Sequence, residues 1–215
     1  MKRKFNADLP TLQKYVRENE VYDYAYYFKS LSLRPHLNPY RSDMYNTFIS
    51  EILDQYNFIG ITERMDESLV VMQLLLNLQT EDILYISTKT SGTQYDYYPH
   101  VKKCIFIPTA NVTQGMKEWF YTEEFENYMA PDILVYEAVN KSLDRTIHEV
   151  IGYEKFQKAL KQFQYAKTVV NEKCPTSSIK FPCSATGQRN EVNDCIQQDV
   201  ACGYKCLDTI QLSSH

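Results

Sequence analysis

Carboxylate side chains are clustered in one short segment, at Glu63, Asp66 and Glu67. They stand between an apolar run, FIGIT, and a run with apolar residues every three or four positions, which indicates a strand-to-helix junction. Carboxylates at the carboxyl end of a strand in an α/β sheet lie where ligands usually bind, and they can act as a general base or a metal site.

A structural interpretation of the same cluster competes with the chemical one. Asp66 can cap the helix, while Glu63 and Glu67 bind amide donors. The two glutamates can also pair with Arg64. We favour this interpretation because polar caps and short-range ion pairs are common where helices begin.

Familiar catalytic and cofactor motifs do not occur in the sequence. There is no G-x-S-x-G nucleophile motif, no H-E-x-x-H zinc motif, and no phosphate-binding loop of the G-x-x-x-x-G-K or G-x-G-x-x-G type. No histidine has the spacing of a metal site or a recognisable nucleophile partner; the four are His36, His100, His148 and His215. We therefore assign no catalytic residue and expect no metal.

Cysteines are concentrated near the carboxyl end. Cys104 stands alone, and the other five are Cys174, Cys183, Cys195, Cys202 and Cys206. An even total with this clustering favours disulfides formed in an oxidising compartment. Zinc is the rival interpretation, but no C-x-x-C pair exists and the spacing does not match common structural zinc sites. We predict that the tail cysteines are oxidised, with Cys104 bound to the odd one, and leave the pairing open.

Charge and hydropathy restrict the partners. The 23 Lys and Arg residues are spread among 27 Asp and Glu residues, for a net charge of −4, so we expect no face that binds nucleic acid. The apolar runs are too short for a transmembrane helix.

The signals for cellular location disagree. The first residues, MKRKFNADLP, lack the apolar core of a secretory signal and by themselves indicate the cytosol. Two sequons, Asn111-Val112-Thr113 and Asn140-Lys141-Ser142, agree instead with the secretory route that the cysteines indicate. The conflict suggests that the beginning of a longer protein is missing.

The elements around the carboxylates follow from periodicity. A helix capped by Ser42 or Asp43 is expected to lead into a buried strand over residues 58–62, and a second helix to follow from Asp66. A helix, a buried strand and another helix in succession predict an α/β layer.

Later elements are predicted in the same way. Extended pieces are expected at residues 83–88 and 104–108, with a polar loop between them. Residues 114–173 are almost wholly helical, with Pro131 at a helix start and Gly152 as an interruption. The fold is thus predicted to be helix-rich α/β.

The composition changes at the last cysteine cluster, where prolines, serines and cysteines replace the periodic pattern. We therefore divide the chain into a main domain at residues 1–173 and a loop-rich, disulfide-linked tail at residues 174–215. The tail is expected to pack on the main domain, because so short a segment buries little without cross-links.

Three segments resemble parts of one enzyme family. FIGITERMDESLVVMQLLL resembles the V-G-V/I-T-E-x-x-D/E-E-S/F-L strand and helix of the Golgi carbohydrate sulfotransferases, especially their galactose-3-O and uronyl-2-O branches. APDILVYEAVNKSLDRTI is similar to the D-x-x-L/F-Y-x-x-A/V-N-x-x-L helix of these enzymes. The tail, FPCSATGQRNEVNDCIQQDVACGYKCLD, resembles the cysteine-rich end of algal-type sulfotransferase-like proteins. The matches span most of residues 18–208.

The resemblance implies a P-loop-like, three-layer fold that transfers a sulfuryl group from 3′-phosphoadenosine 5′-phosphosulfate (PAPS) to a sugar hydroxyl. The family binds the phosphosulfate with an N-terminal K-T/S-G-S/T-T/S loop and a central R-D-P-x-x-R-x-x-S-x-Y stretch, and this sequence has neither. Lys89-Thr90-Ser91-Gly92 has a similar composition but follows the helix, so it is not assigned to phosphate. Thr62 and Glu63, at the end of the matching strand, are carried over as the residues beside the adenine edge of PAPS.

We therefore interpret the chain as the C-terminal half of a sulfotransferase-like protein of the Golgi lumen or secretory pathway, inactive as this fragment. It would arise from a truncated gene model or a degenerate paralogue, and its acceptor would be a carbohydrate on a glycolipid or glycoprotein. The alternative is a secreted, non-catalytic, disulfide-stabilised interaction module. That module would use a tyrosine-rich surface formed by Tyr22, Tyr24, Tyr26 and Tyr27.

Overall fold

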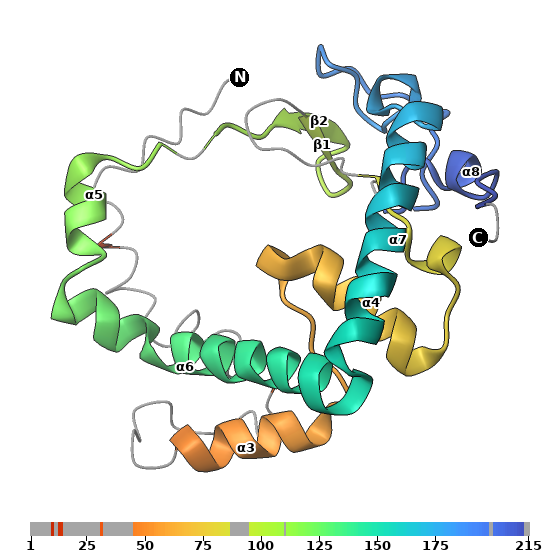
Figure 1. Ribbon diagram of the computed structural model, residues 1–215. Coiled ribbons are helices and arrows are strands. Elements are labelled where there is room, and N and C mark those ends of the chain that lie inside the picture. The colour runs from red at the N-terminus through yellow and green to blue at the C-terminus, as the bar shows by residue number, and fades with distance from the viewer. Residues whose placement is uncertain are drawn as a thin grey trace. The chain divides into compact units, whose positions relative to one another are not determined.

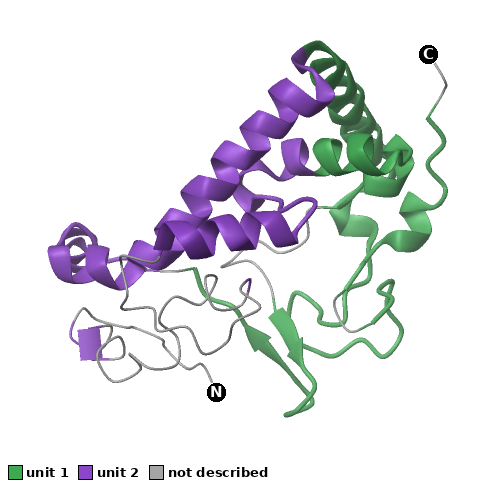
Figure 2. Cartoon of the chain, turned by 90° about the horizontal axis from the view of Figure 1, so that it is seen from below, with its two compact units in different colours: residues 1–5, 69–110, 154–215 green, residues 6–68, 111–153 purple. Residues whose placement is uncertain are grey.

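The computed structural model describes residues 10, 13–14, 31, 45–86, 95–109, 111–197 and 200–212, and helices dominate them (Figure 1). The chain divides into two compact units (Figure 2). Unit 1 comprises Met1–Phe5, Leu69–Ala110 and Glu154–His215, and unit 2 comprises Asn6–Ser68 and Asn111–Tyr153. The tail thus shares unit 1 with the segments that end at Ala110 and begin at Glu154.

Two helices that pack against each other form the core of unit 2, α3 (Tyr45–Gln55) and α6 (Glu123–Arg145). Their buried side chains recur at helical spacing, so each helix presents one apolar face. These side chains are Phe48, Ile49 and Ile52 of α3, and Pro131, Val135, Val139 and Leu143 of α6. Burying each contributes roughly 1.5–3 kcal/mol. The predicted helix before the junction is confirmed, whereas its predicted caps, Ser42 and Asp43, lie outside the described residues.

α6 begins earlier than the sequence pattern predicts. Thr122 caps it by accepting a hydrogen bond from the Phe125 backbone N–H at 3.4 Å, and acidic residues fill the first turn. Pro131, predicted at a helix start, lies inside α6, so that prediction is wrong. A good cap upstream outweighs the hydrogen bond that an internal proline removes.

The helix from Thr122 ends as the sequence predicts. α6 continues into a π-helical turn, η4 (Thr146–Ile151). Gly152 then adopts a φ of 89°, which an L side chain rarely adopts, and the next helix, α7 (Tyr153–Lys173), begins. The prediction that Gly152 interrupts the helical region is therefore confirmed. A short helix, α5 (Gln114–Trp119), precedes α6 and completes this helical part of the chain.

In unit 1, α7 carries the largest buried face. Its buried side chains are Phe156, Ala159, Phe163, Ala166 and Val170. At its end, Val170 and Cys174 pack with Ile210. Partly buried residues that precede α7 in the sequence and others that follow it pack against this cluster: Leu84, Ile86, Cys206, Leu207 and Leu212. Short elements complete the unit: η3 (Thr80–Ile83), η5 (Thr176–Ser178) and α8 (Tyr204–Leu207).

The sheet in the described part of the chain is a two-stranded antiparallel hairpin. β1 (Tyr95–Tyr98) pairs with β2 (Lys103–Phe106), with Tyr97 opposite Cys104. The extended piece predicted around Cys104 is confirmed, but β1 falls where a polar loop was predicted. The strand predicted at residues 83–88 is wrong as far as it is described, because η3 ends at Ile83 and residues 84–86 pair with no strand.

The most consequential difference concerns residues 58–62. Ile61 has extended backbone angles, φ −115° and ψ 126°, yet residues 58–61 belong to no strand and Thr62 opens a 3-10 helix, η2 (Thr62–Arg64). The predicted strand is therefore wrong, while the predicted helix after it is confirmed as α4 (Met65–Leu76). The described residues form no parallel sheet, so the coarse prediction of a helix-rich chain holds and the three-layer P-loop-like fold stays a prediction.

Disulfides link the tail to the rest of unit 1. Cys104 of β2 is bonded to Cys183, and Cys174 at the end of α7 is bonded to Cys206. The third bond joins Cys195 to Cys202 within the tail. The predictions of an oxidised tail and of a tail partner for Cys104 are confirmed.

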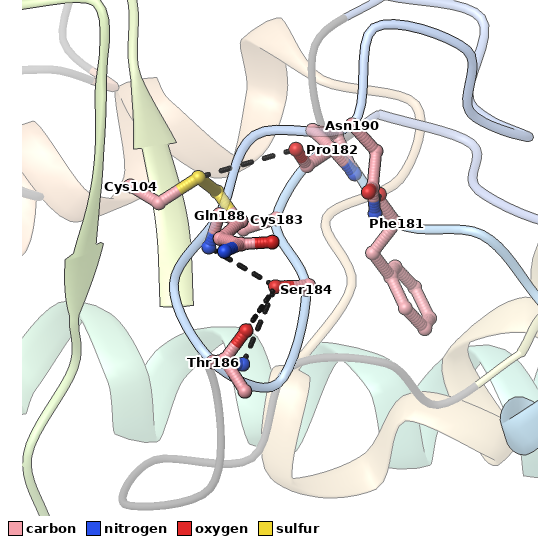
Figure 3. The surroundings of a disulfide bond; sticks show 8 residues. All are labelled: Cys104, Phe181, Pro182, Cys183, Ser184, Thr186, Gln188 and Asn190. Atoms are coloured by element: carbon pink, nitrogen blue, oxygen red, sulfur yellow. Dashed lines mark hydrogen bonds between the residues drawn. A yellow bond between two sulfur atoms is a disulfide. The ribbon is translucent and has the colours of Figure 1, made fainter.

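The turn that carries Cys183 is built around one serine (Figure 3). Ser184 Oγ accepts hydrogen bonds from the backbone N–H groups of Thr186, at 3.3 Å, and Gln188, at 3.0 Å. Asn190 closes the turn by donating from Nδ2 to the Phe181 carbonyl at 2.8 Å. These local bonds fix the loop that meets the hairpin through the disulfide.

Candidate functional site

Thr62 and Glu63 lie at the start of η2, where the extended segment ends, and both side chains are exposed. The residues on either side have fixed positions, because Ile61 is buried and Arg64 donates hydrogen bonds to three side chains. The structure thus presents Thr62 and Glu63 as two exposed polar side chains on a fixed backbone. A hydroxyl and a carboxylate in this position can both accept hydrogen bonds from a ligand.

Ser68 fixes the backbone just before these residues. Its Oγ accepts from the Ile61 N–H at 2.9 Å and donates to the Ile61 carbonyl at 3.2 Å. Ser68 is 4% exposed, so both bonds are buried. These bonds also explain the absence of a strand, because the backbone groups that would pair with a neighbouring strand are used by a side chain.

The close approach of Ser68 also explains Gly60. A Cβ at position 60 would lie 3.2 Å from the Ser68 Cβ, tighter than an ordinary contact. The glycine in FIGIT therefore allows the extended segment to lie against the first turn of α4.

Arg64 links η2 to two other elements. Its Nη1 donates to Asn140 Oδ1 and to Asp144 Oδ1, both at 2.7 Å. Its Nε donates to Glu67 Oε2 at 3.2 Å, and its Nη2 contacts the same oxygen. Asn140 and Asp144 are four residues apart on α6, so they share one helix face. One guanidinium thus joins η2, the first turn of α4 and the later half of α6.

The surroundings favour the charged form of Arg64. Hydrogen bonding to Glu67 raises the pKa of Arg64 above its ordinary value, with Asp144 adding to the effect while partial burial opposes it. The side chain is 23% exposed, so the pair is screened less than a surface pair. We call Arg64 and its three partners, Glu67, Asn140 and Asp144, the clamp. Its role is structural, and the guanidinium of Arg64 stays charged.

The carboxylate cluster agrees with the structural interpretation at Glu67. Glu67 pairs with Arg64, as that interpretation predicts. α4 begins at Met65, so Asp66 lies within its first turn and not at the preceding position where a cap was predicted, although a negative charge there still stabilises the helix. Among the residues that the structure describes, no group of three or more His, Cys, Asp or Glu side chains is arranged to hold a metal ion.

A small polar cavity lies in unit 2, lined by the end of α3, the segment after it and α6. Its lining includes Tyr56, Ile59 and Ser142, and it has a volume of about 20 Å³, which is room for about one water molecule. Thr62 and Glu63 do not line it. The cavity is therefore separate from the two residues predicted as a binding pair.

Other residues singled out in the sequence do not join the junction. The tyrosines at positions 22 to 27, Lys89-Thr90-Ser91-Gly92, His36 and His215 lie outside the described residues. His148 is exposed and its ring stacks on that of Tyr153 at 5.1 Å, which fits a surface role.

Sequence reasoning missed Asn140 and Asp144 as partners of Arg64. It treated Asn140 only as part of a sequon. The available signal was the four-residue spacing of two polar residues on a helix whose apolar face is otherwise well formed.

No family model, curated protein or solved structure matches the chain. In the described ranges, no helix is both long enough and apolar enough to cross a bilayer. Three disulfides indicate folding in an oxidising compartment, in agreement with a secreted or lumenal protein.

Proposed function

We propose that the chain is part of a carbohydrate sulfotransferase-like protein that is located in the Golgi lumen or elsewhere in the secretory pathway. In this proposal the donor is PAPS and the acceptor is a hydroxyl of a carbohydrate on a glycolipid or glycoprotein. The chain supports the nucleotide cleft, and Thr62 and Glu63 face the adenine edge. The two motifs with which the family binds the phosphosulfate do not occur in this sequence.

One observation carries the proposal. The two segments that resemble the sulfotransferases, residues 58–76 and 130–147, meet through the bonds from Arg64 to Asn140 and Asp144. Arg64 belongs to the first segment, and its two partners belong to the second. Two segments that each resemble the same family also contact each other through these bonds, which supports a common origin for both resemblances.

The chemistry defines what the chain's residues would do. An acceptor hydroxyl oxygen bonds to sulfur while the bond from sulfur to the phosphate oxygen breaks, which releases adenosine 3′,5′-bisphosphate and passes the hydroxyl proton to a base. The exposed Thr62 hydroxyl and Glu63 carboxylate fit the adenine end, because both can accept a hydrogen bond from its exocyclic amino group. Holding the base in one position lowers the entropic cost of alignment for the transfer.

The three disulfides keep the second candidate open, a secreted, non-catalytic module stabilised by its cross-linked tail. Reading the transcript upstream of Met1 separates the two. An in-frame K-T-G-T/S loop followed by an R-x-x-x-R-x-x-S stretch supports the sulfotransferase, and a signal peptide directly before Met1 supports the module.

Calorimetry with adenosine 3′,5′-bisphosphate tests on the protein whether this chain contacts only the adenine end of the nucleotide. The 215-residue chain is expected to bind the bisphosphate with no better than millimolar affinity, which gives little or no calorimetric signal, because the phosphate-binding motifs are not in its sequence. Micromolar affinity would contradict the proposal that this chain supplies only support and the adenine edge.

A further inference from the structure

The two N-glycosylation sequons of the chain lie in contrasting surroundings. Asn111-Val112-Thr113 lies in an irregular segment between β2 and α5, and all three residues are exposed. Asn140-Lys141-Ser142 lies inside α6, and Asn140 is only partly exposed. Because a glycan needs a surface site with room around the amide, the two sequons differ as targets.

The first sequon is exposed and has an extended backbone at its threonine. Thr113 has extended backbone angles, φ −71° and ψ 163°, and it precedes the helix that it caps. Its Oγ accepts a hydrogen bond from the Met116 N–H at 3.3 Å. A glycan on Asn111 leaves this cap intact, since the cap uses the threonine and not the asparagine.

The second sequon is used by the fold. Asn140 Oδ1 accepts from Arg64 Nη1 at 2.7 Å, and Asp144 receives a bond from the same nitrogen one turn later. A sugar on the Asn140 amide nitrogen would have to fit beside this clamp. The segment also lies inside α6, a regular helix, whereas a sequon that carries a glycan is expected in a surface loop.

We propose that Asn111 is N-glycosylated and that Asn140 is not. The donor class is a lipid-linked oligosaccharyl diphosphate of the secretory pathway. The Asn111 amide nitrogen bonds to the first sugar carbon, the bond from that carbon to the diphosphate oxygen breaks, and the amide loses one proton as the lipid diphosphate leaves. The three disulfides place the folding chain in the type of compartment where this donor is found.

The test expresses the full chain behind a cleavable secretory leader in mammalian cells. Protein from the medium, or from the protease-protected microsomal fraction if it is retained, is treated with peptide N-glycosidase. We expect a mass loss of one N-glycan and conversion of Asn111 to aspartate in the peptide map. Asn111→Gln should abolish the loss, and Thr113→Ser should retain it because serine keeps both the sequon and the cap.

Ser142→Ala is the matched control, since it removes the second sequon while leaving the Asn140 amide in place. It should leave the mass loss unchanged. A glycosidase-insensitive chain in the lumenal fraction would overturn the proposal, and so would a glycan found on Asn140. Neither result depends on whether the chain binds a nucleotide.

Discussion

At the scale of single residues, Arg64 differs from an ordinary surface ion pair. Its side chain is 23% exposed and it binds groups on two helices, whereas Arg145 and Glu149 approach only to 3.9 Å with side chains 75% and 71% exposed. Bonds to charged groups contribute more when they are partly buried, and exposed pairs contribute little. Arg64 should therefore contribute far more to the free energy of unfolding than Arg145.

Arg64→Ala is expected to lower the free energy of unfolding by about 1–2 kcal/mol, because it leaves Glu67, Asn140 and Asp144 without their shared donor. Arg145→Ala, the control, should lower it by less than about 0.5 kcal/mol. Denaturant unfolding of the three proteins measures both changes. Equal effects of the two substitutions would show that the clamp contributes nothing special.

The pH dependence of this effect follows from the direction of the Arg64 pKa. Hydrogen bonding to Glu67 raises that pKa in the folded chain, so the stabilisation is fully present below the unfolded-state pKa and is lost only as the pH rises through the folded one. Both lie above the working range of most proteins. Titration of Arg64 should therefore not change the difference in the free energy of unfolding between wild type and Arg64→Ala from about pH 6 to about pH 9.

At the scale of elements, the sequence predicted the helices better than the extended segments. The helical regions around α3, α4 and α7 follow from a strong three-to-four-residue periodicity. The segment at residues 58–61 also has the apolar, β-branched composition of a strand, but a strand depends on a partner that composition does not reveal. Here the Ser68 side chain takes the place of the partner at Ile61.

The same reasoning explains the other misses. The start of α6 depends on the cap at Thr122, which outweighs the familiar signal of Pro131. β1 depends on cross-strand pairing of Tyr95 with Phe106, whose rings lie 5.2 Å apart, and on a tail turn packed against it. Thr62 and Glu63 could be chosen only by resemblance, because nothing in their local pattern distinguishes an exposed binding pair from exposed loop residues.

Ser68→Ala tests whether the junction is held as described. Removal of the hydroxyl leaves a buried Ile61 N–H without an acceptor, which costs about 1–3 kcal/mol. Hydrogen exchange at the Ile61 amide should accelerate accordingly. The exposed Ser177→Ala is the control and should change neither quantity; unchanged exchange at Ile61 in Ser68→Ala would refute the serine's role.

At the scale of the whole molecule, the disulfides close loops of very different length. The bonded cysteines are 79, 32 and 7 residues apart in sequence for Cys104–Cys183, Cys174–Cys206 and Cys195–Cys202. Because a cross-link restricts the unfolded chain more when its loop is longer, the first bond should stabilise the protein most.

Replacing each pair with serines should reveal that order. Loss of Cys104–Cys183 is expected to cost about 4–5 kcal/mol and loss of Cys195–Cys202 about 2–3 kcal/mol, from loop entropy. Thermal unfolding of the three double variants provides the comparison, and non-reducing peptide mapping of the wild type checks the pairs. The prediction fails if the tail-internal bond proves the most stabilising or if mapping returns other pairs.

The proposed function rests on Thr62 and Glu63 as the base-binding edge of a nucleotide cleft. Amide chemical-shift mapping during titration with adenosine 5′-monophosphate, with inosine 5′-monophosphate as the control that lacks the exocyclic amino group, tests it most directly. We expect weak, millimolar-range shifts centred on Thr62 and Glu63 with the adenine nucleotide and much smaller ones with the control. Shifts of equal size with both nucleotides, or none at these two amides, would contradict it.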